Sequence, residues 1–122
     1  MANSYKDLRV WNLSVSFALD IYRQTQAFPR EEMYGLTSQL RRAAVSVASN
    51  IAEGKGRRSD KEFLFFPYHA RGSLLEVETQ LLIARKLNYL GEPAAEHLTA
   101  KSEELAKNLN ALINSFKGAI AA

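Results

Sequence analysis

Basic residues around a glycine-rich turn are the side chains best suited to bind a ligand. The sequence Glu-Gly-Lys-Gly-Arg-Arg occupies positions 53–58, and Arg41 and Arg42 precede it by about three helical turns. Glycines let a ligand come close to the backbone, and guanidinium groups bind phosphate through two parallel hydrogen bonds. The pattern therefore predicts contact with a nucleic-acid backbone. The predicted contact residues are Arg41, Arg42, Lys55, Arg57, Arg58 and Arg71.

A purely structural role for these residues stays open. Glycines also serve turns, and arginines also solvate a loop or pair with a carboxylate of a neighbouring helix or subunit. The segment is not a P-loop, because Gly-x-x-x-x-Gly-Lys-Ser/Thr does not occur in the chain. An alternative function is therefore a protein–protein interaction adaptor with no nucleic-acid ligand, in which the basic segment pairs with acidic protein surfaces.

Residues for catalysis or metal binding do not converge in the sequence. His69 and His97 lie on different predicted helices, and neither has a histidine or carboxylate four residues away. Glu76 and Glu78 are two positions apart and diverge on a helix. The absence of cysteine excludes a thiol nucleophile and a thiolate zinc site. We expect no enzyme activity, no metal, no cofactor and no small-molecule substrate.

The composition indicates one folded domain spanning residues 1–122. Hydrophobic residues make up 47% of the chain and charged residues 24%, and the net charge is only +3. Residues 41–71 hold seven basic and three acidic side chains, so this segment alone carries +4. We find no apolar run of about 18 residues and no apolar signal segment at the start. We therefore expect a cytoplasmic protein that does not enter a membrane.

Four segments with helical periodicity must position the basic residues. The predicted helices span about residues 5–27, 34–53, 60–90 and 93–117. We expect Gly54 to cap the second helix in the left-handed conformation, and Ser59 with Glu62 to form a capping box at the third. Pro67 predicts a kink near the start of that helix, although the apolar stripe continues across it. Short connections predict an all-α, antiparallel, up-down-up-down four-helix bundle.

Two of the predicted helices carry more apolar residues than one buried stripe needs. For the first helix we expect the core stripe to be Leu8, Trp11, Val15, Ala18, Leu19 and Tyr22. The additional rows, which predict a surface for self-association, are Val10, Leu13, Phe17 and Ile21 on the first helix and Leu64, Leu75 and Leu82 on the third. The other interpretation of these rows is a wide core stripe or a surface that is slightly more apolar than usual.

Several motifs of this chain are similar to those of a known family. They are YKDLRVW at 5–11, GLTSQLRRAAVSVASNIAEG at 35–54, GSLLEVETQL at 72–81 and LNYL at 87–90. With these motifs the chain resembles the bacterial four-helix-bundle family encoded by intervening sequences of 23S ribosomal RNA genes. The sequence departs from the family pattern at Pro67 and at positions 47–48, where isoleucine-proline is common.

The resemblance implies a four-helix protomer that assembles into a ring-like homopentamer. It also suggests a distant likeness to the accessory variability protein of diversity-generating retroelements, a basic pentameric bundle that associates with nucleic acid. We therefore expect a non-enzymatic homopentameric scaffold that associates with ribosomal or other structured RNA through its basic segment 41–71. Its expected partners are copies of itself and such an RNA.

Overall fold

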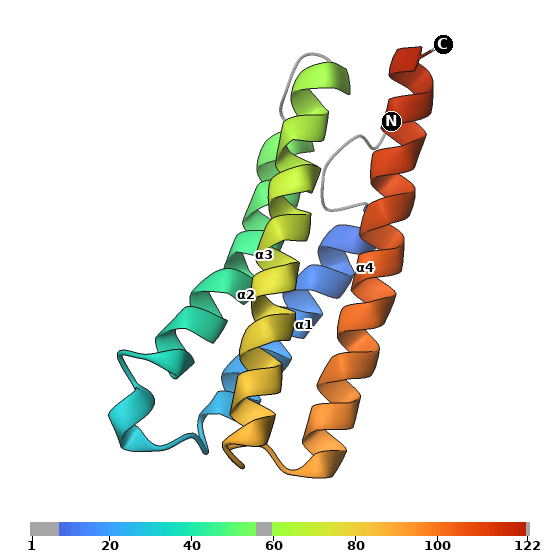
Figure 1. The fold of residues 1–122 in the computed structure, drawn as a ribbon. Coiled ribbons are helices and arrows are strands. Elements are labelled where there is room, and N and C mark those ends of the chain that lie inside the picture. Colours follow the sequence, from blue (N-terminus) through green and yellow to red (C-terminus); the bar gives the residue numbers. More distant parts are fainter. Residues whose placement is uncertain (1–7, 56–59, 122) are drawn as a thin grey trace.

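Four long helices make up the part of the chain that the computed structural model describes, residues 8–55 and 60–121. They are α1 (Arg9–Thr25), α2 (Leu36–Lys55), α3 (Asp60–Lys86) and α4 (Glu92–Ala121), with a short 3-10 helix η2 (Arg30–Glu32) between α1 and α2 (Figure 1). These described residues form no strand. The predicted all-α fold of four helices is confirmed, and it is consistent with a four-helix bundle.

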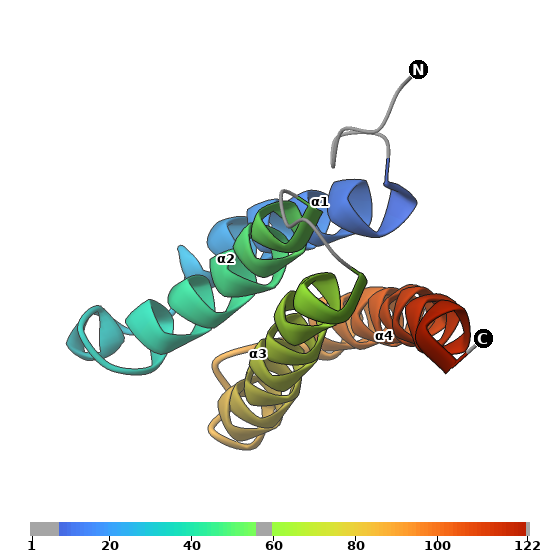
Figure 2. The same cartoon turned by 90° about the horizontal axis from the view of Figure 1, so that it is seen from above.

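Each helix packs against two neighbours. Contacts join α1 to α2, α2 to α3, α3 to α4, and α4 back to α1. Within the described ranges, no Cα atoms of α1 and α3, or of α2 and α4, come within 8 Å of each other. Viewed from above, α1 and α2 lie together on one side of the bundle, and α3 and α4 lie on the other (Figure 2). The face formed by α1 and α2 is therefore opposite the face formed by α3 and α4.

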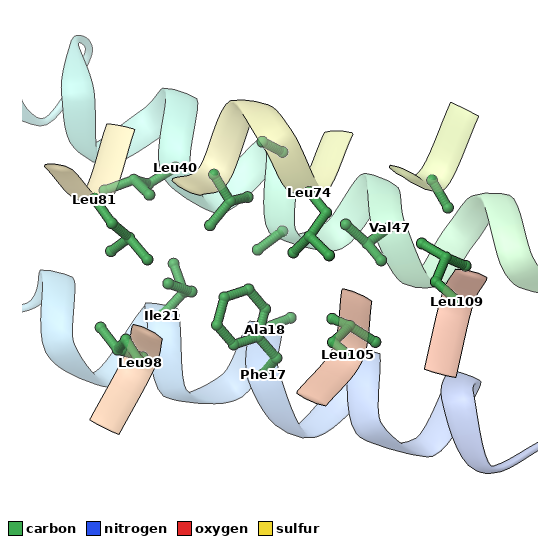
Figure 3. Close-up of a cluster of buried hydrophobic side chains, with 14 of the residues drawn as sticks. Phe17, Ala18, Ile21, Leu40, Val47, Leu74, Leu81, Leu98, Leu105 and Leu109 are labelled. Atoms are coloured by element: carbon green, nitrogen blue, oxygen red, sulfur yellow. The ribbon is translucent and has the colours of Figure 1, made fainter. Parts of the chain in front are cut away.

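The interior is filled by aliphatic residues from all four helices, with one aromatic ring from α1 among them. Phe17 is almost completely buried and points into the cluster of Leu and Val side chains (Figure 3). Full burial of one Leu, Ile or Phe side chain contributes roughly 1.5–3 kcal/mol. The largest of its almost fully buried side chains are Phe17, Ile21, Leu40, Val47, Ile51, Leu74, Val77, Leu98, Leu105, Leu109 and Ile113.

The predicted core stripe of α1 is confirmed for Ala18, which is buried, and for Leu8 and Trp11, which pack against the core, but the orientation is wrong for the other residues. Val10, Phe17 and Ile21, which we expected on the outer surface, are buried in the core, and Leu13 packs against it. Leu19 and Tyr22, which we expected inside, are 49% and 42% exposed. Both sides of α1 are apolar, so periodicity alone could not choose between them. In the observed orientation, α1 makes polar contacts with both α2 and α4.

The turn after α3 differs from the prediction that this helix reaches residue 90. Asn88 has a positive φ of 64°, its N–H donates to the carbonyl oxygen of Arg85, and the N–H of Tyr89 donates to that of Ala84. This is a Schellman motif with asparagine in the left-handed position, and it ends α3 at Lys86. The tyrosine hydroxyl then donates to Glu32 at 3.0 Å, and this hydrogen bond raises the pKa of Tyr89.

Gly54 lies inside α2 and does not cap it, contrary to the prediction. It is buried, and none of the described glycines has a positive φ. A Cβ added at Gly54 would lie 2.9 Å from the Cβ of Phe66 and 3.2 Å from the carbonyl oxygen of Phe63. The glycine therefore allows the ends of α2 and α3 to approach closely.

Pro67 lies inside α3, which runs through it as one helix, as the continuous stripe predicted. Its ring is buried on the same side as Phe63 and Ala70. The kink at Pro67 stays a prediction, and Ser59 of the predicted capping box lies outside the described residues.

The close approach at Gly54 generates the first testable prediction. Gly54→Ala should lower the free energy of unfolding by roughly 1–3 kcal/mol, because the methyl group meets backbone and Cβ atoms that cannot rotate away. Urea denaturation followed by circular dichroism measures the change. The matched control is Gly118→Ala, whose Cβ would enter open space in α4. An equal effect of both substitutions would contradict the steric explanation.

Candidate interaction surfaces

Arg41 is engaged inside the protein and links α2 to α1. Its Nε donates to Thr25 Oγ1 at 2.9 Å, and its Nη2 donates to the carbonyl oxygen of Tyr22 at 3.3 Å. The guanidinium also lies 4.7 Å from the centre of the Tyr22 ring. These contacts use two of the three guanidinium nitrogens of Arg41, so much of its capacity to bind an external phosphate is already taken.

Arg42 and Lys55 remain available to a ligand. Arg42 is exposed and forms no ion pair with any described residue. It lines an open groove between α2 and α3 together with Gln39, Ser46, Glu76 and Gln80. Lys55 is the last residue of α2 and is half-buried. Both cations therefore lie on α2.

Arg71 lies on a different side of the bundle, between α3 and α4. It donates to Asn110 Oδ1 at 3.0 Å, and its guanidinium lies 4.9 Å from the centre of the Tyr68 ring. The sequence placed Arg41, Arg42 and Arg71 in one contact set, but each lies beside a different pair of helices. Arg57 and Arg58 fall outside the described residues.

No local pattern in the sequence indicated the polar cluster that joins α1 to α4. Asp20 Oδ2 accepts hydrogen bonds from Lys101 and, at 3.2 Å, from His97, and Lys101 also donates to Ser16 at 2.7 Å. Arg23 pairs with the other oxygen of Asp20 at 3.2 Å. Partial burial by itself raises the pKa of Asp20, but the hydrogen bonds and charges of Lys101 and His97 outweigh it, so the pKa lies below its ordinary value.

A row of apolar side chains runs along the outside of α3. Leu75 and Leu82 are 58% and 51% exposed, and Phe65 and Tyr68 continue the row toward the start of the helix. We call these four residues the α3 ridge. Of the interface residues predicted on this helix, Leu75 and Leu82 are thus on the surface, whereas Leu64 packs against the core. Spacing of three and seven residues along one face is typical of helices that pack against another helix.

Leu82 borders a groove of about 330 Å³ between α3 and α4. Glu78 and Glu103 also line this groove, and Ser102 donates to Glu78 Oε2 at 2.7 Å. Near its end Arg85 binds the carboxylate of Glu92 through two nitrogens. The groove thus combines apolar walls with two carboxylates, and it adjoins the α3 ridge.

Neither a metal-binding cluster nor a membrane-spanning helix is present in the described ranges. No three or more of their histidine, aspartate and glutamate residues are grouped so as to hold a metal ion. In the same ranges, no helix has the length and apolarity needed to cross a lipid bilayer.

A family model supplies the first comparison with known proteins. The model described as 23S rRNA-intervening sequence protein matches residues 6–111. The chain belongs to this family. The match covers all of α1, α2 and α3 and most of α4.

A solved structure supplies the second comparison. It is a protein of unknown function from the S23 ribosomal protein family of Bacteroides thetaiotaomicron VPI-5482, with a TM-score of 0.77 and 23% sequence identity. The superposition covers 85% of this chain and 97% of that one. At this identity the likeness supports the fold alone. A comparison with curated proteins finds no match.

The Asp20 cluster generates a prediction about stability and pH. Because the pKa of Asp20 is lower in the folded chain than in the unfolded one, its contribution is complete above about pH 4 and is lost as the pH falls through the folded pKa. Asp20→Asn should lower the unfolding free energy at pH 7 by roughly 1–2 kcal/mol and flatten its decrease at acid pH. Urea titrations between pH 2.5 and 7 measure both effects. If Asp20→Asn leaves the decrease of stability at acid pH unchanged, or if the exposed Glu96→Gln lowers stability equally, the role given to Asp20 would be contradicted.

Proposed function

We propose that this 23S rRNA-intervening sequence protein is a non-enzymatic, cytoplasmic scaffold that self-associates and binds structured RNA. The exposed α3 ridge is the observation that carries the proposal. Exposure of Leu75 and Leu82 to water does not stabilise the protein. A row of exposed apolar side chains of this length on a small protein is typical of an interaction site. A second protein surface that covers the ridge removes this area from water.

The proposed protomer is an antiparallel bundle, and the proposed assembly is a ring-like homopentamer. Contacts between neighbouring helices support the antiparallel order, because rising numbers on one helix meet falling numbers on the next. On α2 and α3, Gln39 meets Gln80 and Ser46 meets Ser73. The subunit number of five rests on the family resemblance.

RNA is the ligand we propose for α2, which carries Arg42 beside the groove to α3 and Lys55 at its last position. Arg42 and Lys55 are the described cations of the basic segment that no internal contact occupies, and Arg57 and Arg58 follow directly in the sequence. Repetition of this set around a ring gives several weak phosphate contacts on one particle. Multivalency then raises the overall affinity far above that of one subunit.

A protein–protein adaptor without a nucleic-acid ligand is the second candidate function. It is favoured by the internal contacts of Arg41 and Arg71 and by the carboxylate of Glu76, which lines the same groove as Arg42. These features reduce the positive potential that an RNA backbone would meet. The two functions differ in how strongly binding depends on salt.

The RNA proposal predicts a salt-dependent affinity for structured ribosomal RNA. The logarithm of the binding constant should fall linearly with the logarithm of the salt concentration, because phosphate contacts release counterions. Arg42→Ala with Lys55→Ala should weaken binding at least tenfold and reduce this slope. Fluorescence anisotropy with a labelled ribosomal RNA fragment at several salt concentrations measures both quantities.

The matched control for that experiment is Arg30→Ala. Arg30 is an exposed cation in η2, before the start of α2, whereas Lys55 ends that helix about 30 Å away at 1.5 Å per residue. It should leave affinity and slope nearly unchanged. Equal losses for the control and the double variant would indicate a general charge effect, and no RNA binding at low salt would leave the adaptor function.

A further inference from the structure

The protein has a second exposed apolar surface besides the α3 ridge. It consists of Val15, Leu19 and Tyr22 from α1 with Val45 and Ala48 from α2, and we call it the α1–α2 face. The contact of Arg41 with Tyr22 places these residues on the same side, since Leu19 lies one turn before Tyr22 and Val45 one turn after Arg41. Leu19, Tyr22 and Val45 are each more than two-fifths exposed.

We propose that the α3 ridge of one molecule packs on the α1–α2 face of a second copy of this chain. The inference rests on the self-association proposed above and adds which surfaces meet. Because the two surfaces lie on opposite sides of the bundle and differ from each other, the contact is head-to-tail. A pair joined in this way still has one free ridge and one free face, so association continues until a ring closes or a filament grows.

The shapes of the two surfaces are complementary. The α3 ridge presents the large side chains Leu75 and Leu82, separated by two helical turns. On the α1–α2 face, the small residues Ala48 and Ala52 come after Val45 on successive turns of α2. Small side chains open a shallow groove between two helices, and a row of leucines from a third helix can lie in such a groove.

The charges beside the two surfaces are also complementary. Glu78 and Glu103 line the groove next to Leu82, and the cation Arg85 in the same groove is already bound to Glu92. Arg41 lies within the α1–α2 face. Among the described residues, no partner is bound to the Nη1 atom of Arg41 or to Glu103. A head-to-tail contact therefore brings a guanidinium toward carboxylates.

Pairing of two α3 ridges is the main alternative, and it is less favourable. It would bring Glu78 and Glu103 of one molecule near the same carboxylates of its partner, and like charges repel. It would also leave Leu19, Tyr22 and Val45 exposed in the assembly. The head-to-tail contact avoids both costs.

A mixing experiment tests the inference with two double variants. The ridge variant carries Leu75→Glu and Leu82→Glu, and the face variant carries Leu19→Glu and Val45→Glu. All four side chains are at least two-fifths exposed, so the helices should still form, which circular dichroism checks. The control is Leu87→Glu, an equally exposed leucine just beyond α3.

Light scattering after size-exclusion chromatography should find the wild-type chain and Leu87→Glu as oligomers and each double variant as a monomer of 13.7 kDa. An equimolar mixture of the two double variants should form a dimer of twice that mass, because the intact ridge of one still fits the intact face of the other. The dimer cannot grow further, since its two outer surfaces are disrupted.

Two results would overturn the inference in distinguishable ways. If the face variant keeps the wild-type mass while only the ridge variant dissociates, the ridge pairs with itself, and self-association survives without the head-to-tail contact. If the wild-type chain is a monomer at every concentration, the self-association in the proposed function fails as well.

Discussion

The polar contacts that fix the rotation of α1 about its axis are the constraint on which the rest of the structure depends. Asp20 binds Lys101 and His97 of α4, and on the other side Thr25 accepts a hydrogen bond from Arg41 of α2. Either apolar side of α1 could face a hydrophobic core. These contacts turn Phe17 and Ile21 inward, and Leu19 and Tyr22 consequently remain outside.

The orientation of α1 connects the core with the surfaces that we propose as partner-binding sites. With Phe17 at its centre, the core is complete within one chain, so the apolar residues left over on α1 and α3 do not serve the stability of the protomer. Burial of these residues in contacts between molecules would make the bundle one subunit of a larger assembly. The same contacts engage Arg41, so Arg42 and Lys55 are the cations on which the proposed RNA contact rests.

The sequence predicted the parts of this structure that depend on local pattern. Four helices, the continuity of α3 through Pro67 and the family follow from periodicity and motifs. Lys101 lies 81 residues from Asp20, and Asn110 lies 39 residues from Arg71, and no local pattern encodes such contacts. The prediction that Gly54 caps α2 was wrong for a related reason. A glycine near a helix end is equally suited to a helix cap and to a close approach of a second helix, and only the position of Phe66 decides between these two roles.

Cross-linking between single cysteines tests most directly whether two different surfaces meet. The natural chain has no cysteine, so Leu19→Cys and Leu82→Cys each introduce a single thiol. After the two variants are mixed under a mild oxidant, mass spectrometry can count the three possible dimers. The account predicts that cross-links between residue 19 of one chain and residue 82 of another predominate. A majority of 82-to-82 cross-links, with residue 19 unreacted, would contradict it.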